Sequence, residues 1–132
     1  MTGFPLKIVT PDGLEFDGMA EQLIVRTVTG DMGIMAKHAD CVAPLGMGEA
    51  TVVVDGKKRY AACIGGMVSV IGGVVNLVPT TFEWAENIDV ARAEASEKRA
   101  QAVLANKNAT DTEIKLAKAR LRRALVRKNV RR

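Results

Sequence analysis

The chain has 132 residues, of which 48% are hydrophobic and 4% aromatic, and this length suits one compact domain or a domain with an appendage. It contains no uncharged apolar run of about 18 residues, so we expect no membrane-spanning helix, and its N-terminus lacks the pattern of a secretory signal. Residues 1–113 contain ten Lys and Arg against fifteen Asp and Glu, whereas residues 114–132 contain nine basic residues and no acidic residue. This uneven charge predicts an acidic partner for the C-terminal segment.

Residues 1 to about 80 have the composition and turn pattern of an all-β domain. Three turn signals separate the β-branched runs: Pro11-Asp12-Gly13, Asp55-Gly56 and Gly72-Gly73. The expected strands lie at residues 6–10, 14–17, 21–29, 51–54, 57–63, 67–71 and 74–78. Many short strands at this spacing predict a sandwich or a flattened barrel.

The segment from Thr29 to Met35 is expected to be a loop that joins two strand regions. It places the apolar residues Met32, Ile34 and Met35 among turn glycines and ends shortly before His38. In one interpretation this loop folds back onto the core. In the other interpretation its apolar residues form a docking surface.

The sequence offers little support for catalysis. His38 is the single histidine, and without a ligand pattern of other His or Cys around it, it makes a poor metal site. The patterns of a nucleophile elbow, a P-loop and a dinucleotide-binding loop are absent. Cys41 and Cys63 follow no CxxC pattern and are expected to be free thiols. We therefore expect a non-catalytic interaction protein without a metal site.

From Ile88 onward the chain is expected to form two helices, because it is rich in Ala, Glu, Arg and Lys and has no Gly or Pro. The break between the helices is expected at Asn106-Lys107-Asn108, and Thr110 with Glu113 forms a capping-box pattern for the second helix. The predicted apolar stripes consist of Ile88, Ala91, Ala95, Ala102 and Ala105 in the first helix and of Ile114, Ala117, Leu121, Ala124 and Leu125 in the second. Stripes made mostly of Ala bury little area, which predicts a weakly held antiparallel hairpin.

The fold class is therefore α+β, an N-terminal all-β sandwich over residues 1–86 followed by a helical hairpin over residues 87–132. The expected boundary is a short connector at residues 80–87. We expect the first part to be a docking domain and the second a regulatory domain.

The sequence resembles the epsilon subunit of the F-type ATP synthase along essentially its whole length. The resemblance is carried by residues 6–13, by Gly30-Asp31-Met32-Gly33-Ile34 before His38-Ala39, by Gly65-Gly66, and by residues 83–93 with Ile88-Asp89 and Arg92-Ala93. It implies a ten-stranded sandwich with two helices and a rotor subunit that couples gamma to the c-ring. It also implies helices that either fold or extend toward the alpha and beta subunits, where they inhibit ATP hydrolysis. Residues 40–49 depart from the usual family pattern, because Asp40-Cys41-Val42 follows His38-Ala39 where members often have Pro-Leu-Leu, and residues 46–49 are also unusual.

The resemblance also implies roles for individual residues, with no cofactor required and ATP as a candidate regulatory ligand. The candidate ATP site consists of Glu83, Ile88, Asp89, Arg92, Ala93, Arg99, Arg122, Arg123 and Arg127. The candidate contacts with the c-ring and gamma are Asp31, Met32, Gly33, Ile34, Met35 and His38. The candidate inhibitory arm contains Lys115, Lys118, Arg122, Arg123, Arg127 and Lys128. Membership in this family would place the chain on the cytoplasmic face of a bacterial cell membrane as a peripheral protein.

A nucleic-acid-binding module that uses the basic C-terminal helix is the alternative interpretation. The nine basic residues of that segment could contact phosphates. However, the sequence has no recognised DNA-binding motif, and the acidic β region would repel a phosphate backbone. We therefore expect no nucleic acid among the partners.

Overall fold

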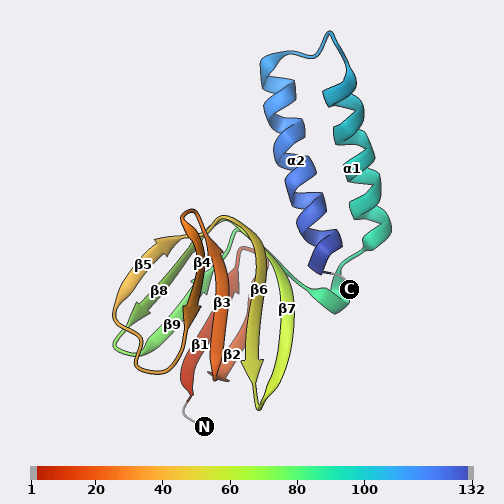
Figure 1. Cartoon of the computed structure of the whole chain (residues 1–132). Helices are drawn as coiled ribbons and strands as arrows, with labels where there is room; N and C mark the ends of the chain where they lie inside the picture. Colours follow the sequence, from red (N-terminus) through yellow and green to blue (C-terminus); the bar gives the residue numbers. More distant parts are fainter. Residues whose placement is uncertain (1–2, 131–132) are drawn as a thin grey trace. The chain divides into compact units, whose positions relative to one another are not determined.

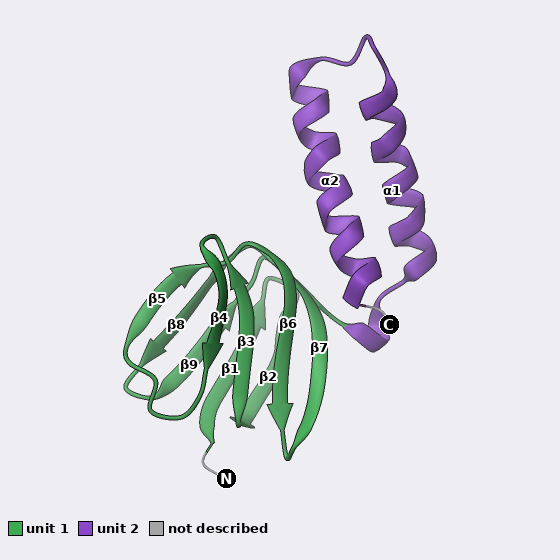
Figure 2. Cartoon of the chain, in the orientation of Figure 1, with its two compact units in different colours: residues 1–84 green, residues 85–132 purple. Residues whose placement is uncertain are grey.

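The computed structural model describes residues 3–130, and over these residues it contains ten strands and two α-helices (Figure 1). The strands are β1 (Phe4–Thr10), β2 (Gly13–Ala20), β3 (Gln22–Thr27), β4 (Gly30–Ile34), β5 (Cys41–Pro44), β6 (Met47–Val54), β7 (Lys57–Ile64), β8 (Met67–Ile71), β9 (Val74–Val78) and β10 (Thr81–Trp84). A short 3₁₀ helix at Ala85–Asn87 precedes α1 (Val90–Ala105) and α2 (Asp111–Val130). The predicted fold class is confirmed. The chain divides into two compact units, Met1–Trp84 and Ala85–Arg132 (Figure 2).

The first unit is a sandwich of two five-stranded sheets. The first sheet has the order β2-β1-β9-β8-β5, and the second sheet has the order β10-β7-β6-β3-β4. Apolar side chains from both sheets fill the space between them, and Leu6, Leu23, Ile34 and Leu77 are among the fully buried ones. The core is thus built mainly from aliphatic side chains, with Phe4, Phe82 and Trp84 among them.

The two hairpins predicted from glycine-containing turns are confirmed. β6 pairs with β7 around Asp55 (φ 52°) and Gly56 (φ 74°), and β8 pairs with β9 around Gly72 (φ 57°) and Gly73 (φ 81°). Positive φ at both central residues is the condition for a type I′ turn, whose twist matches that of the flanking strands.

Several strand predictions were wrong or incomplete. The expected loop at residues 29–35 is largely strand β4, the expected connector at residues 80–87 contains strand β10, and β5 was missed. β4 includes two glycines and an aspartate, and β5 ends in a proline, so both have low β propensity. β4, β5 and β10 all lie at sheet edges, where pairing with one neighbour overrides a weak local preference.

Close packing of β3 against the start of β6 explains two glycines in residues 46–48. A Cβ added at Gly48 would lie 2.6 Å from Arg26 Cβ, and one at Gly46 would lie 3.2 Å from the Thr27 carbonyl oxygen. The Gly46 amide donates to the Arg26 carbonyl oxygen at 2.9 Å. Glycine is therefore required at position 48 because the Arg26 side chain occupies the space of a Cβ, and the Thr27 carbonyl leaves little room for one at position 46.

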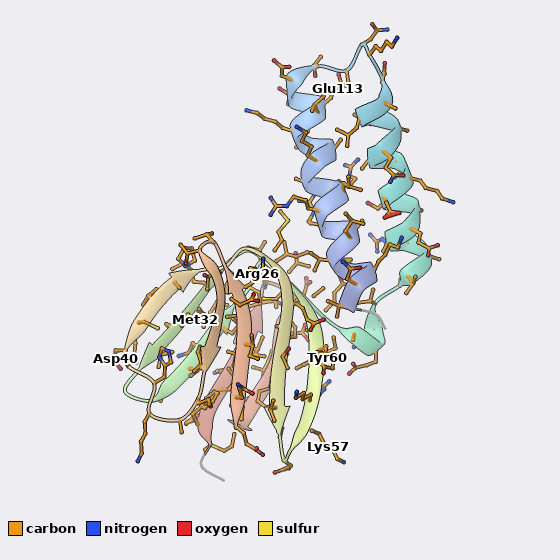
Figure 3. The ribbon with its side chains drawn as sticks, viewed as in Figure 1. Arg26, Met32, Asp40, Lys57, Tyr60 and Glu113 are labelled. Atoms are coloured by element: carbon orange, nitrogen blue, oxygen red, sulfur yellow. The ribbon has the colours of Figure 1, made fainter. Side chains whose placement is uncertain are left out.

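The second unit contains the predicted helical hairpin, with the predicted break and the predicted capping box of the second helix. Thr110 Oγ1 accepts from the Glu113 amide at 3.2 Å, and Glu113 Oε1 accepts from the Thr110 amide at 3.2 Å, so the capping box is confirmed (Figure 3). Asp89 is the N-cap of α1 and accepts from the Arg92 amide at 3.0 Å. Over the described residues, no helix is both long and apolar enough to span a membrane.

The apolar stripe predicted for the first helix lies on the wrong side of that helix. Ala91, Ala95, Ala102 and Ala105 are exposed, whereas Ala93 and Ala100 are buried. In the second helix, Ala117 and Ala124 are buried as predicted, Ile114 and Leu121 are half-buried, and Leu125 is exposed. Ile88 is buried, but it lies before the N-cap of α1 rather than within the helix.

Candidate interaction surfaces

The segment expected to dock through an exposed apolar loop is only partly available for contact. Ile34 is fully buried in the sandwich core, and Met32 on β4 packs partly against that core (Figure 3). Asp31 and Gly33 are exposed, and so is Met35 just beyond β4. The interpretation of these residues as a loop that exposes Ile34 was therefore wrong, because β4 alternates its side chains between core and solvent.

Hydrogen bonds hold β4 and the loop that follows it in place. Asp31 Oδ1 accepts from Arg26 Nε at 2.6 Å, and this hydrogen bond and the charge of Asp31 raise the pKa of Arg26. His38 is half-buried, and its amide donates to the Met35 carbonyl oxygen at 3.3 Å. Asp40 Oδ1 accepts from the Gly72 amide at 2.9 Å. Asp40 thus ties this loop to the β8–β9 hairpin.

The outer face of the first sheet is a second candidate surface, which was not predicted from the sequence. Strand register places exposed or half-buried apolar residues side by side in two rows across all or most of the sheet. The first row consists of Met19, Pro5, Val74 and Ile71, and the second consists of Leu14, Val9, Val78, Met67 and Pro44. A polar row with Asp17, Lys7, Asn76 and Ser69 runs between them. We call these three rows the docking face.

The exposure of this face is unusual for side chains of this size. Ile71 is 61% exposed, Val78 48% and Met67 43%, although their neighbours in sequence fill the core. Single exposed apolar residues are normal, but continuous apolar rows on one sheet face indicate a surface that a partner covers. The available signal was that β8 and β9 are apolar at nearly every position, whereas a strand with one solvated face alternates.

The first helix presents two arginines of the candidate ATP site on one side. Arg92 and Arg99 are both exposed and lie seven residues apart, so the helical repeat places them on the same face. Relative to the buried Ala100, Arg99 lies on one side and Glu97 on the other. The Asp89 carboxylate, another member of the candidate ATP site, already caps the helix through one oxygen.

The second helix divides its basic residues between two sides. Arg123 and Arg127 are half-buried and lie one turn apart, whereas Arg122 is exposed and about 100° away from Arg123. Lys128 lies on the other side of the seam from Arg123 and forms an ion pair with Glu97 of α1. Because that pair fixes the register, Arg123 and Arg127 lie on the same side of the hairpin as the two arginines of α1.

The six residues expected in the inhibitory arm therefore do not form one face. Lys115, Lys118 and Arg122 are exposed and lie together on the side of α2 that faces away from α1. Arg123 and Arg127 lie on another side, and Lys128 lies at the seam. Glu83, from the candidate ATP set, lies on β10 in the first unit, where it is half-buried and opposite Ala62.

The other groups with chemical potential are buried or isolated. Burial raises the pKa of the Cys63 thiol from 9.0 to about 12, which makes it unreactive near neutral pH. Cys41 is half-exposed, and both thiols are free. In the part of the chain that the structure describes, no group of three or more His, Cys, Asp or Glu side chains is placed to hold a metal ion.

Both units match models of known protein families. The model described as "ATP synthase, Delta/Epsilon chain, beta-sandwich domain" matches residues 3–85, and the model of its "long alpha-helix domain" matches residues 86–130. The chain belongs to the ATP synthase delta/epsilon family. The ATP synthase epsilon chain of Ruminococcus albus is 40% identical over 131 residues, which cover 98% of this chain and 97% of the relative. The epsilon chain of Shouchella clausii is 36% identical over 130 residues, covering 98% and 96%.

The fold is also that of a chain in the cryo-EM structure of the Euglena gracilis mitochondrial ATP synthase, OSCP/F1/c-ring in rotational state 1. That likeness has a TM-score of 0.81 at 22% identity and covers 92% of this chain and 77% of that chain. The resemblance to bacterial epsilon subunits of the F-type ATP synthase is therefore confirmed. Members of this family are non-catalytic subunits, which agrees with the lack of catalytic patterns in the sequence.

Proposed function

We propose that this epsilon-family chain is a central-stalk subunit that joins the gamma subunit to the c-ring through its sandwich and restrains ATP hydrolysis through its helical hairpin. The observation that carries the first part is the docking face, two apolar rows around a polar row on the outer surface of the first sheet. A surface with this pattern is typical of one that a protein partner covers.

The docking face is the proposed contact with gamma. The segment with Asp31, Met35 and His38, together with the Gly72-Gly73 turn that Asp40 holds, is the proposed contact with the c-ring. We expect residues 1–86 to fold alone and to bind purified gamma. A folded fragment without affinity for gamma would refute the proposal. Stronger binding to duplex DNA than to gamma at about 0.15 M salt, where non-specific phosphate contacts weaken, would instead favour the nucleic-acid module.

The regulatory part of the proposal rests on the charge of α2. From Ile114 to the end of the chain there are nine basic residues and no acid, and Lys115, Lys118 and Arg122 are exposed on one side. Such a helix binds an acidic surface, which the resemblance locates on the catalytic beta subunits. Deleting residues 114–132 should raise ATP hydrolysis by the reconstituted complex while rotor assembly stays intact. Unchanged hydrolysis at every nucleotide concentration would show that α2 is not inhibitory.

ATP is the proposed regulatory ligand of the closed hairpin. Arg92, Arg99, Arg123 and Arg127 lie on one side of it, and four guanidinium groups there suit a triphosphate. Because ATP would bind only the closed form, it would favour closure without being hydrolysed. Calorimetry of the whole chain with millimolar ATP tests this, with Arg92→Ala expected to weaken binding and Arg122→Ala, on the other side of α2, expected to leave it unchanged. Equal affinity in Arg92→Ala and the wild type would refute the site.

The complex would hold the chain at the cytoplasmic face of the cell membrane as a peripheral protein. This part of the proposal follows from the family rather than from a membrane-binding feature of the chain, since neither described helix could span a bilayer. Co-sedimentation with membranes that contain or lack the c-ring tests it, and binding to membranes without the c-ring would refute it.

A further inference from the structure

An ion pair between Glu97 and Lys128 links the two helices of the hairpin. Lys128 Nζ lies 3.1 Å from Glu97 Oε1 and 3.3 Å from Glu97 Oε2. The Glu97 side chain is only 15% exposed and the Lys128 side chain 32%. A charge pair at this depth is screened less by salt than an exposed pair, and removing one partner leaves the other charge half-buried without compensation.

The rest of the seam gives little stabilisation of its own. Over the described residues, the buried side chains of the two helices are Ala93 and Ala100 on α1 and Ala117, Ala124 and Val130 on α2. All but Val130 are alanines, and alanine removes little apolar surface from water. When the hairpin closes, α2, which has no acidic residue after Glu113, packs against α1. On α1, Glu97 is half-buried at the seam, whereas Glu94 one turn earlier is exposed to solvent. Glu97 therefore supplies the negative charge that faces α2 from the packed side of α1.

We propose that Glu97 is the closing latch of the hairpin, an internal acid that holds Lys128 at the seam and so keeps it from any external acidic surface. Lys128 cannot be both at the seam and against a partner, so the free energy of the pair adds directly to the cost of opening. This inference rests on the proposed regulatory function for its consequence in the complex, but the latch itself is a property of the isolated chain.

The test measures hairpin opening in the full chain by thiol labelling. In a Cys41→Ser background, Ala117→Cys places a thiol at the seam, where the native residue is 3% exposed. If opening and closing are fast, the labelling rate is proportional to the open population. Ala124→Cys, at a position that is 1% exposed, provides a second probe in case the first perturbs packing.

Glu97→Gln should speed labelling about fivefold, the change in an equilibrium constant expected when an ion pair of this kind is lost. The matched control Glu94→Gln removes the same charge one turn away and should leave the rate unchanged. Exchanging the two charges, Glu97→Lys with Lys128→Glu, should restore slow labelling, which a merely structural role of either side chain would not do.

Equal labelling rates in Glu97→Gln, Glu94→Gln and the parent chain would overturn the latch, and so would failure of the charge exchange to slow labelling. If the latch behaves as expected but deletion of residues 114–132 leaves ATP hydrolysis unchanged, the latch stands and the inhibitory function fails. The two proposals therefore fail in different experiments.

Discussion

Placing a charge in the docking face should abolish binding to gamma without unfolding the sandwich. Val78 lies in the second apolar row beside Met67 and is 48% exposed. Full burial of a valine side chain is worth about 1.5–3 kcal/mol, so covering the exposed half contributes about 1 kcal/mol to binding. In Val78→Asp an unpaired carboxylate would have to be desolvated in the same place, which costs at least about 2 kcal/mol more. The sum, about 3 kcal/mol, raises the Kd for gamma more than about 100-fold.

The matched control is Val28→Asp, because Val28 is 65% exposed in the turn between β3 and β4 and lies outside the docking face. Binding to immobilised gamma should be nearly unchanged in this control. Fluorescence of Trp84, the single tryptophan and 5% exposed, reports whether either variant is folded. A loss of β propensity of up to about 1 kcal/mol is expected in Val78→Asp because β9 is a central strand. Folded Val78→Asp that binds gamma as tightly as Val28→Asp would refute the docking face.

Two further predictions concern the stability of the sandwich. Because burial holds the pKa of Cys63 at about 12 against 9.0 in the unfolded chain, the folded state keeps a proton that the unfolded state loses, so the free energy of unfolding falls as pH rises above 9. This group lowers the free energy of unfolding by up to about 1.4 kcal/mol per pH unit. Urea titrations at several pH values above 9 should show a smaller decrease of the free energy of unfolding with pH in Cys63→Ala than in the wild type, and equal decreases would contradict the argument. Gly48→Ala should lower the free energy of unfolding by about 1–3 kcal/mol because the new Cβ meets Arg26. Gly33→Ala on β4, with open space around the new Cβ, should change the free energy of unfolding by less than about 0.5 kcal/mol. Equal effects of Gly48→Ala and Gly33→Ala would show that β3 and β6 can move apart at no cost and that the close packing at Gly48 is not needed.

The sequence predicted the elements that local chemistry determines. Asp55-Gly56 and Gly72-Gly73 determine their turns through positive φ, and Thr110 with Glu113 determines a helix start through two reciprocal hydrogen bonds. These signals depend only on residues close in the chain, so a pattern of a few letters contains all the information. That residues 1–86 fold alone stays a prediction.

The missed strands and the misjudged docking segment depend on pairing between distant residues. Ile34 is buried because β4 pairs with β3, opposite Leu23, and both side chains point into the core. Local sequence, with glycines on each side of Met32, indicated a loop. The docking face has the same origin, because its rows form only when β2, β1, β9 and β8 align in register. The candidate contact residues therefore could be named from the family resemblance, but their exposure could not be judged from it.

The phase of α1 shows why an alanine-rich helix is hard to orient from its own sequence. Alanine occurs at residues 91, 93, 95, 100, 102 and 105, so stripes of nearly equal apolarity can be drawn at more than one phase. The observed phase buries Ala93 and Ala100 and turns Glu97 toward α2. An acidic residue on the apolar face of an isolated amphipathic helix is unfavourable. It becomes favourable when all the charged residues of the opposing helix after its first turn are basic. The buried face of α1 therefore combines Ala93 and Ala100 with an acid that meets Lys128, and the residue that breaks the apolar pattern is the one on which closure of the hairpin is proposed to depend.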